Sequence, residues 1–226
     1  MGALIRGVGC CDSGGLDEVF TERFARGAAR RFRKRGLTRS ERRIVAFVEE
    51  QGLEGLSVLE IGGGVGELHI ELLRRGAARA TNLELAGAYE PEAARLLQES
   101  GLSDRVERRL LDIAEAPEAV GPADVVVLHR VVCCYPDYER LLAAAGSHAR
   151  RTLVFSHPPR NPLSRALLWA ENLTMRVRGL TYRAFVHPPA AMLAVLRAQG
   201  LEVRELRGGP VWQVAGLVRP PDGTAR

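Results

Sequence analysis

Apolar positions along the chain fall into two patterns, and each pattern predicts a different kind of element. Short apolar runs bounded by glycine, proline or charged residues predict strands, whereas apolar residues three or four positions apart predict amphipathic helices. The predicted strands are residues 57–61, 80–85, 105–111, 124–129, 152–156, 202–207 and 211–218. The predicted helices are residues 16–32, a segment that begins with a capping box at Thr38 and Glu41, and residues 66–75, 89–100, 137–149, 162–178 and 188–199.

The order of these elements indicates the fold class. Strands and helices alternate between residues 57 and 156, which is typical of an open parallel α/β sheet. The last two strands are separated only by a Gly-Gly-Pro turn, which is short enough for an antiparallel hairpin. We therefore expect an α/β protein with a helical cap in residues 1–52, a main domain in residues 53–220 and a frayed tail in residues 221–226.

Composition places the chain among globular proteins. Its 226 residues are 46% hydrophobic and 26% charged, which suits one domain with a hydrophobic core. No run approaches the roughly 18 apolar residues of a membrane span, and the first ten residues lack the apolar core of a signal peptide. The four cysteines form two adjacent pairs without a C-x-x-C spacing. We therefore expect a cytoplasmic protein with reduced thiols and no bound metal.

Positive charge is concentrated near the N-terminus. Residues 23–43 contain ten basic residues and one acid, so this segment carries +9 while the whole chain carries +5. Four interpretations remain open: a solvated helix face, a lid that recognises an anionic substrate, a peripheral membrane contact and an RNA-binding surface. Phe20, Phe24 and Phe32, opposite the arginines, support the membrane contact. No interleaving of aromatic and basic residues accompanies the segment, which disfavours nucleic acid as a partner.

The strongest functional signal is a glycine cluster after the first parallel strand. Residues 58–66 read Val-Leu-Glu-Ile-Gly-Gly-Gly-Val-Gly, so a strand runs into glycines before a helix begins. Glycines there let the backbone approach a ligand closely at the carboxyl edge of the sheet. A dinucleotide fingerprint would require glycine at position 67, where the chain has Glu67, and a carboxylate beside a pyrophosphate is unfavourable. The Gly-Lys-Ser/Thr of a Walker loop is also absent from this segment.

The pattern E-x-G-x-G-x-G at residues 60–66 resembles motif I of the class I S-adenosylmethionine-dependent methyltransferases. The resemblance implies a Rossmann-like, seven-stranded, mostly parallel sheet in the order 3-2-1-4-5-7-6, and S-adenosyl-L-methionine as the cofactor. It also implies that Glu84 accepts hydrogen bonds from the ribose hydroxyls, and that Asp112 and Ile113 lie against the adenine. The cofactor-binding residues that it implies are Glu60, Gly62, Gly64, Gly66, Glu84, Leu85, Asp112, Ile113 and His129.

Within that superfamily, residues 124–135 are similar to the fourth strand and following loop of the magnesium-protoporphyrin O-methyltransferases. Those enzymes tend to carry His-Tyr-Pro in the loop, whereas this chain has Cys134, Tyr135 and Pro136. The missing histidine argues against a porphyrin substrate. The Asn/Asp-Pro-Pro-Tyr motif is absent after this strand, which disfavours an enzyme that methylates the amino groups of bases or glutamine.

The resemblance also directs the choice of catalytic and substrate-binding residues. Methyl transfer is an in-line displacement in which the cofactor supplies the reactivity and the protein aligns the acceptor with the methyl group. A general base is needed only where the acceptor is neutral at the working pH. We expect a small, partly apolar acceptor molecule. The catalytic candidates are His129, Tyr135 and His157, and the substrate-binding candidates are Cys133, Cys134, Tyr135, Trp169 and Tyr182.

Three alternative functions remain open at this stage. Two converging thiol pairs, Cys10 with Cys11 and Cys133 with Cys134, could hold a thiophilic metalloid such as As(III) for methylation. A non-catalytic partner that keeps the fold would bind the cofactor without turning it over, or would not bind it. RNA methylation would use the basic segment. The sequence identifies neither the acceptor atom nor the oligomeric state.

Overall fold

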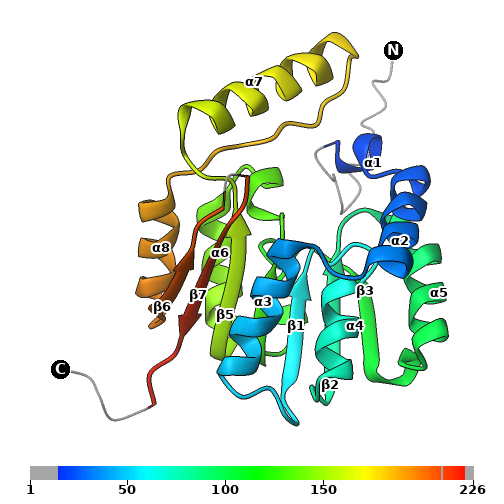
Figure 1. The fold of residues 1–226 in the computed structure, drawn as a ribbon. Helices are drawn as coiled ribbons and strands as arrows, with labels where there is room; N and C mark the ends of the chain where they lie inside the picture. Colours follow the sequence, from blue (N-terminus) through cyan, green and yellow to red (C-terminus); the bar gives the residue numbers. More distant parts are fainter. Residues whose placement is uncertain (1–14, 210, 222–226) are drawn as a thin grey trace, which may run out of the picture.

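A seven-stranded sheet forms the middle of the molecule, with helices packed on both of its faces (Figure 1). The computed structural model describes residues 15–209 and 211–221. The strands are β1 (Ser57–Ile61), β2 (Arg79–Glu84), β3 (Val106–Leu110), β4 (Ala123–Leu128), β5 (Ala149–His157), β6 (Glu202–Arg207) and β7 (Gln213–Val218). The α-helices are α1 (Leu16–Val19), α2 (Glu22–Arg35), α3 (Arg39–Glu50), α4 (Glu67–Arg74), α5 (Glu90–Ser100), α6 (Tyr138–His148), α7 (Pro162–Val177) and α8 (Pro189–Ala198).

The strand order is β3-β2-β1-β4-β5-β7-β6, which confirms the expected order and fold class. Strand β1 pairs in parallel with both β2 and β4. Strand β7 is the last in the sequence, yet it lies between β5 and β6 and runs antiparallel to both. Because the strand order reverses between β1 and β4, the carboxyl ends of these strands leave a crevice where a ligand can bind.

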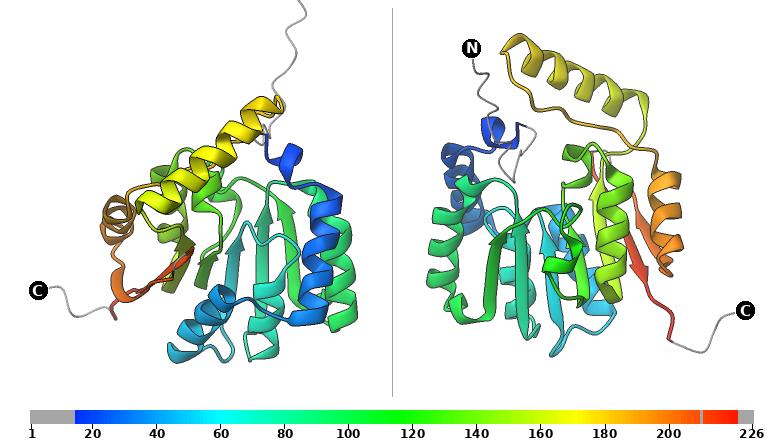
Figure 2. Two further views of the ribbon diagram at one scale, coloured as in Figure 1. Left: turned by 45° about the horizontal axis from the view of Figure 1, so that its top comes forward. Right: turned by 180° about the vertical axis from the view of Figure 1, so that it is seen from behind.

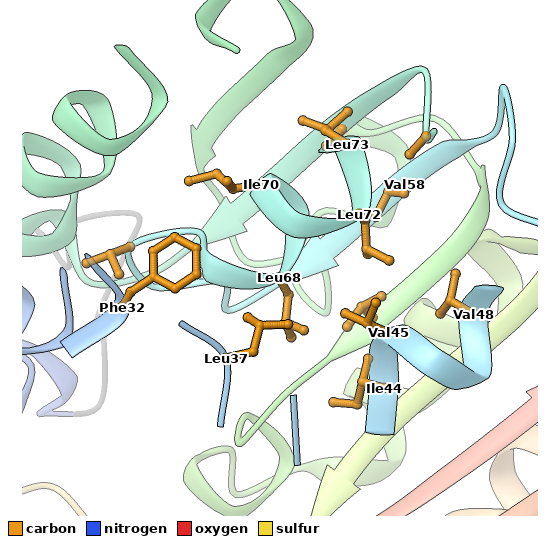
Figure 3. Packing of buried hydrophobic residues seen from close by; sticks show 14 of the residues in the cluster. Phe32, Leu37, Ile44, Val45, Val48, Val58, Leu68, Ile70, Leu72 and Leu73 are labelled. Atoms are coloured by element: carbon orange, nitrogen blue, oxygen red, sulfur yellow. The ribbon is translucent and has the colours of Figure 1, made fainter. Parts of the chain in front are cut away.

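Alternate residues of the central strands feed two separate cores. Val58 of β1 belongs to the core covered by α2, α3, α4 and α5, and Figure 3 shows it packed among aliphatic residues of α3 and α4. Leu59, the next residue, belongs to the opposite core, which α6 and α8 cover. Every residue of β1 is buried. This double burial explains why β1 and β4 are nearly continuous apolar runs in the sequence.

The prediction of one helix over residues 16–32 is wrong. The first helix ends before Phe20, and a second helix begins after Thr21. The Thr21 hydroxyl accepts a hydrogen bond from the Phe24 backbone N–H at 3.4 Å. A threonine that caps α2 in this way competes with continuation of α1. The predicted stop at Gly36 and the capping box that opens α3 are both present.

Helix α7 and the segment that follows it stand apart from the sheet, above its carboxyl edge (Figure 2). The Asn172 side chain of α7 joins the two segments, because it donates to the Ala184 carbonyl and accepts from the Ala184 N–H, each at 2.8 Å. Within the described residues, no helix is long and apolar enough to cross a membrane. The cytoplasmic location and the domain boundaries expected from the sequence stay predictions.

Candidate active site

A cavity of about 840 Å³ opens at the carboxyl ends of β1, β2 and β4. Residues of α1, α2 and α7 line its other side. Its volume lies within the range of about 300–1,000 Å³ that is typical of small-molecule sites. The crevice predicted by the strand order is therefore present as a partly open cavity, and the N-terminal helices and α7 form part of its wall.

The cavity wall contains most of the residues that the sequence predicted for the site. Among the residues that are not in the wall, Gly66 caps α4, the His157 ring is buried at the end of β5, and Trp169 lies on the exposed side of α7. Cys10 and Cys11 lie outside the described residues. The predicted residues that line the cavity are Glu60, Gly62, Gly64, Glu84, Leu85, Asp112, Ile113, His129, Cys133, Cys134, Tyr135 and Tyr182.

The glycine loop after β1 adopts a backbone that other residues would resist. Gly62 and Gly64 have φ angles of 67° and 54°, in the left-handed region that favours glycine. A Cβ at Gly62 would also lie 2.5 Å from a methyl of Val131. Glycine is therefore required at this position for lack of space as well as for backbone conformation. The loop therefore brings bare backbone to the cavity surface.

Glu60, at the end of β1, is held by a histidine that the sequence analysis did not identify. Its Oε2 lies 2.5 Å from Nδ1 of His69 and accepts from the His69 backbone N–H at 3.3 Å. Both side chains are almost completely buried. This contact fixes the first turn of α4 against β1. His69 is three residues after Gly66, the last glycine of the cluster, and nothing in its sequence context marked it.

Glu84 closes the floor of the cavity at the end of β2. Its Oε2 accepts from the Gly64 N–H at 2.8 Å, and its Oε1 accepts from the N–H groups of Leu85 and Ala86 at 2.8 and 3.1 Å. Burial raises the pKa of Glu84, although the three N–H groups oppose the increase. These three bonds use both lone-pair sites of Oε1 and one of Oε2, so the remaining acceptor capacity for a ligand hydroxyl is on Oε2.

Asp112 and Tyr135 form a linked pair after β3. The Tyr135 hydroxyl donates to Asp112 Oδ2 at 2.9 Å, and Asp112 Oδ1 accepts from the Ala114 N–H at the same distance. Burial and then the bond to Asp112 raise the pKa of Tyr135 well above its ordinary value. Tyr135 is therefore a poor base at neutral pH, and its geometry suits the orientation of Asp112.

A charged cluster links the basic helix α2 to the glycine loop. Arg31 Nη2 donates to Glu67 Oε1 at 2.8 Å and to Glu41 Oε1 at 3.4 Å, and all three residues line the cavity. Burial raises the pKa of Glu67 to about 7, and the Glu41 carboxyl adds to this increase. The ion pair with Arg31 lowers the pKa but does not overcome the burial. From the sequence, Arg31 was predicted only as part of the basic segment. Glu67 was noted only because a carboxylate at this position disfavours dinucleotide binding.

His129 faces the same cluster from the end of β4. Its Nε2 lies 3.7 Å from Glu41 Oε1, while its Nδ1 lies 2.8 Å from the Ser156 hydroxyl. Ser156 Oγ already accepts from the Arg130 N–H at 3.0 Å, so its own proton is available for His129 Nδ1. Nδ1 is therefore engaged by Ser156, while Nε2 has no hydrogen-bond partner among the described residues. Burial lowers the pKa of His129 to about 3, so the ring is neutral.

Two adjacent cysteines and a tyrosine form the polar part of the wall opposite the glycine loop. Cys133 Sγ lies 3.7 Å from Cys134 Sγ, and Cys134 Sγ lies 3.1 Å from the Tyr182 hydroxyl. The neighbouring Cys133 thiol lowers the pKa of Cys134, whereas the pKa of Cys133 is raised by the same contact and by burial. Within residues 15–209 and 211–221, no group of three or more His, Cys, Asp or Glu side chains could hold a metal ion.

Solved structures with the same fold come from several kinds of protein. Magnesium protoporphyrin IX methyltransferase from Synechocystis PCC 6803, solved with S-adenosylhomocysteine, is 23% identical, with a TM-score of 0.65 over 80% of this chain and 82% of that one. An O-methyltransferase family protein from Burkholderia thailandensis is 22% identical, with a TM-score of 0.67 over 90% of this chain and 64% of that one. At these identities the likeness shows the fold. No curated protein matches the chain.

A family model identifies the chain more directly. The model of the methyltransferase domain matches residues 23–206, which include the glycine loop, α7, most of the cavity wall and all of α2 except its first residue. The match confirms the class of protein that the glycine loop and the strand order predicted, and the cofactor of this class is S-adenosylmethionine. The chain belongs to the methyltransferase domain family.

Proposed function

We propose that the protein transfers a methyl group from S-adenosylmethionine to a small, partly apolar molecule. The observation that carries this proposal is the single cavity that joins the glycine loop, Glu84 and Asp112 to a largely apolar chamber. One end offers backbone and carboxylates, and the other is lined by aliphatic and aromatic side chains. The apolar residues of that chamber include Leu16, Val19, Phe20, Phe24, Leu167 and Leu168.

The residues at the polar end fit the proposed donor. The glycine loop presents backbone to the cavity, Glu84 keeps free acceptor capacity on Oε2, and Asp112 is held by two hydrogen bonds. His129 Nε2 is buried and has no hydrogen-bond partner among the described residues, as expected of a group that meets a ligand. When bound, S-adenosylmethionine supplies an activated methyl group. The protein's part is to hold donor and acceptor in line and to exclude water.

The neighbouring structures support a small-molecule acceptor. One of them acts on magnesium protoporphyrin IX, and an O-methyltransferase family 2 protein from Planctomyces limnophilus was solved in complex with apigenin. In this chain the polar groups that face the acceptor chamber include Cys134 and Tyr182, together with Ser164 and Glu171 of α7. Because the pKa of Cys134 is lowered, it is the best candidate for accepting a proton from a neutral acceptor. Burial lowers the pKa of His129 to about 3, which makes its ring a weak base.

Calorimetric titration with S-adenosylhomocysteine tests the donor assignment. We expect wild-type protein to bind it with roughly micromolar affinity and to give no heat with NAD, and Glu84→Ala to weaken binding by about tenfold or more. Glu118→Gln, which removes an exposed carboxylate away from the cavity, should bind as wild type. Absence of binding to wild-type protein would refute the donor assignment. Binding without methyl transfer to any O-, N- or S-acceptor would instead indicate a non-catalytic partner.

A second candidate acceptor is a thiophilic metalloid such as arsenite. The observation that favours it is the close pair of sulfurs in the cavity wall, one of which has a lowered pKa. Formation of methylated arsenic by the wild-type protein, and its loss in Cys133→Ser/Cys134→Ser, would establish this activity. Unchanged methylation of an organic acceptor by the same variant would show that the cysteines only line the pocket.

A further inference from the structure

Helix α7 exposes most of its large apolar residues, while the face that it turns towards the protein carries Ser164 and Asn172 together with Leu168 and Met175. Ser164 is its one buried residue, and the Asn172 amide holds it to the strap formed by residues 178–188. Leu168 and Met175 are half-buried. A helix on the surface of a soluble monomer normally has the reverse orientation. The large apolar residues that α7 exposes are Leu163 (62%), Leu167 (58%), Trp169 (67%), Leu173 (43%) and Val177 (79%).

Arginines border this apolar side. Arg165 and Arg176 are exposed next to Trp169 on the helical wheel, and Arg178 is exposed just after the last turn. None of the three forms an ion pair with a described residue, whereas most acids elsewhere on the surface are paired. The only acid of α7 is Glu171, which lines the cavity. The exposed side of α7 is therefore apolar, with the arginines along the margin that carries Trp169 and the exposed Glu171 along the opposite margin.

The views of the whole molecule show that nothing described covers this side. Helix α7 projects beyond the sheet, and its outer surface faces away from α1, α6 and the strap (Figure 2). The helix has 16 residues, which corresponds to a length of about 24 Å. It is too short and too charged at its ends to span a bilayer, but long enough to lie along one.

We propose that the exposed side of α7 docks on the surface of an anionic lipid bilayer. The leucines, Trp169 and Val177 would enter the interface, and the arginines would contact the lipid phosphates. This arrangement satisfies both features of the helix at once, because aliphatic side chains and a tryptophan suit the interfacial region while arginines suit the headgroups.

A second copy of the chain fits this surface less well. A symmetric dimer formed through α7 would place the positive margin of one helix against the same margin of the other. The one acid of α7, Glu171, is exposed on the opposite margin, so it would not lie next to these arginines to compensate for that repulsion. Lipid phosphates provide the missing negative charge, which is why the bilayer is the better occupant.

The position of α7 relates the docking surface to the cavity. Ser164, Leu167, Leu168 and Glu171 line the chamber, while Trp169 and Val177 on the same helix face outward. Docking would therefore bring the cavity mouth close to the bilayer, from which an apolar ligand could enter. The docking itself does not depend on methyl transfer, so the two proposals can fail separately.

Sedimentation with vesicles tests the proposal on the full-length protein. Vesicles of equal parts phosphatidylcholine and phosphatidylglycerol should carry the protein down, and vesicles of phosphatidylcholine alone should carry down much less. Trp169→Gln/Val177→Gln should weaken binding roughly tenfold or more, because it removes two large apolar groups from the interface. Arg176→Gln should weaken it about fivefold.

A matched control separates docking from a general loss of surface hydrophobicity. Leu110→Gln/Leu206→Gln removes two leucines that are 54% and 62% exposed on β3 and β6, and it should bind vesicles as wild type does. In a Trp212→Phe background, Trp169 reports alone, and its fluorescence should shift to the blue with anionic vesicles. Equal weakening by both double variants would overturn the proposal. Failure of the wild-type protein to bind anionic vesicles would also overturn it. If, in addition, analytical ultracentrifugation showed a dimer that Trp169→Gln/Val177→Gln dissociates, the occupant of this surface would be a second copy of the chain.

Discussion

Replacing Glu67 by glutamine should stabilise the protein at alkaline pH and change little near pH 5. Burial raises the pKa of this carboxyl from 4.5 to about 7, and its side chain is only 14% exposed. Between these two pKa values the folded chain holds a proton that the unfolded chain has released. Folded stability therefore falls by about 1.4 kcal/mol for each pH unit above 4.5 and levels off near pH 7, a total of about 3 kcal/mol. Glutamine stays neutral and avoids this loss, while its oxygen can still accept from Arg31.

Urea unfolding at pH 5 and pH 8.5 measures the effect. The free energy of unfolding of Glu67→Gln should exceed that of wild type by about 3 kcal/mol at pH 8.5 and match it at pH 5. Glu118→Gln removes the same charge from an exposed position and controls for a change in net charge. Equal destabilisation of Glu67→Gln at both pH values would show that the ion pair with Arg31 outweighs burial, and would refute the reasoning.

Three further predictions concern acid stability, the glycines of α2 and the cysteine pair. Burial lowers the pKa of His129 to about 3, so wild type should lose stability as the pH falls from 6.5 towards 3, and His129→Gln should flatten that slope in urea unfolding. Gly27→Ala should stabilise the helix by about 1 kcal/mol. A Cβ at Gly36 would also meet no neighbour, but this glycine is at φ 62° and ψ −151°, so Gly36→Ala should cost about 1–3 kcal/mol. Thermal melts that rank the two variants in the opposite order would contradict this. Iodoacetamide should label Cys134 before Cys133, and mass spectrometry showing the opposite order would contradict their assigned pKa shifts.

The sheet and its ligand edge could be read from the sequence because they rest on local signals. Three of these signals each involve only a few adjacent residues. They are the glycines after a buried strand, the acids at the ends of the next two strands and the Gly-Gly-Pro turn. The chamber opposite could be read only in part. His69 and Ser156 meet their partners across 9 and 27 positions, and neither has a pattern around it that marks the contact.

The N-terminal segment shows a different kind of limit. Its apolar spacing is continuous from Leu16 to Phe32, so periodicity alone predicts one helix. The interruption between α1 and α2 occurs at Thr21, a residue type that can either cap the N-terminus of a helix or lie within one. Likewise, the exposed apolar side of α7 was read as a wall of the pocket, because spacing shows that a helix is amphipathic but not which side faces the protein.

The place of β7 in the sheet has a consequence for synthesis. This strand is the last in the sequence but lies between β5 and β6, so until residues 213–218 have left the ribosome β5 can pair only with β4 and β6 has no partner. The nascent chain up to that point exposes a long, apolar edge at β5, which is the kind of edge that pairs with other chains. Helix α3, which packs against both β5 and β7, can reach its final position only after the strand is inserted. Completion of the sheet therefore waits for the last strand, and a ribosome stalled before residue 213 would hold a chain that is more prone to aggregate than to fold.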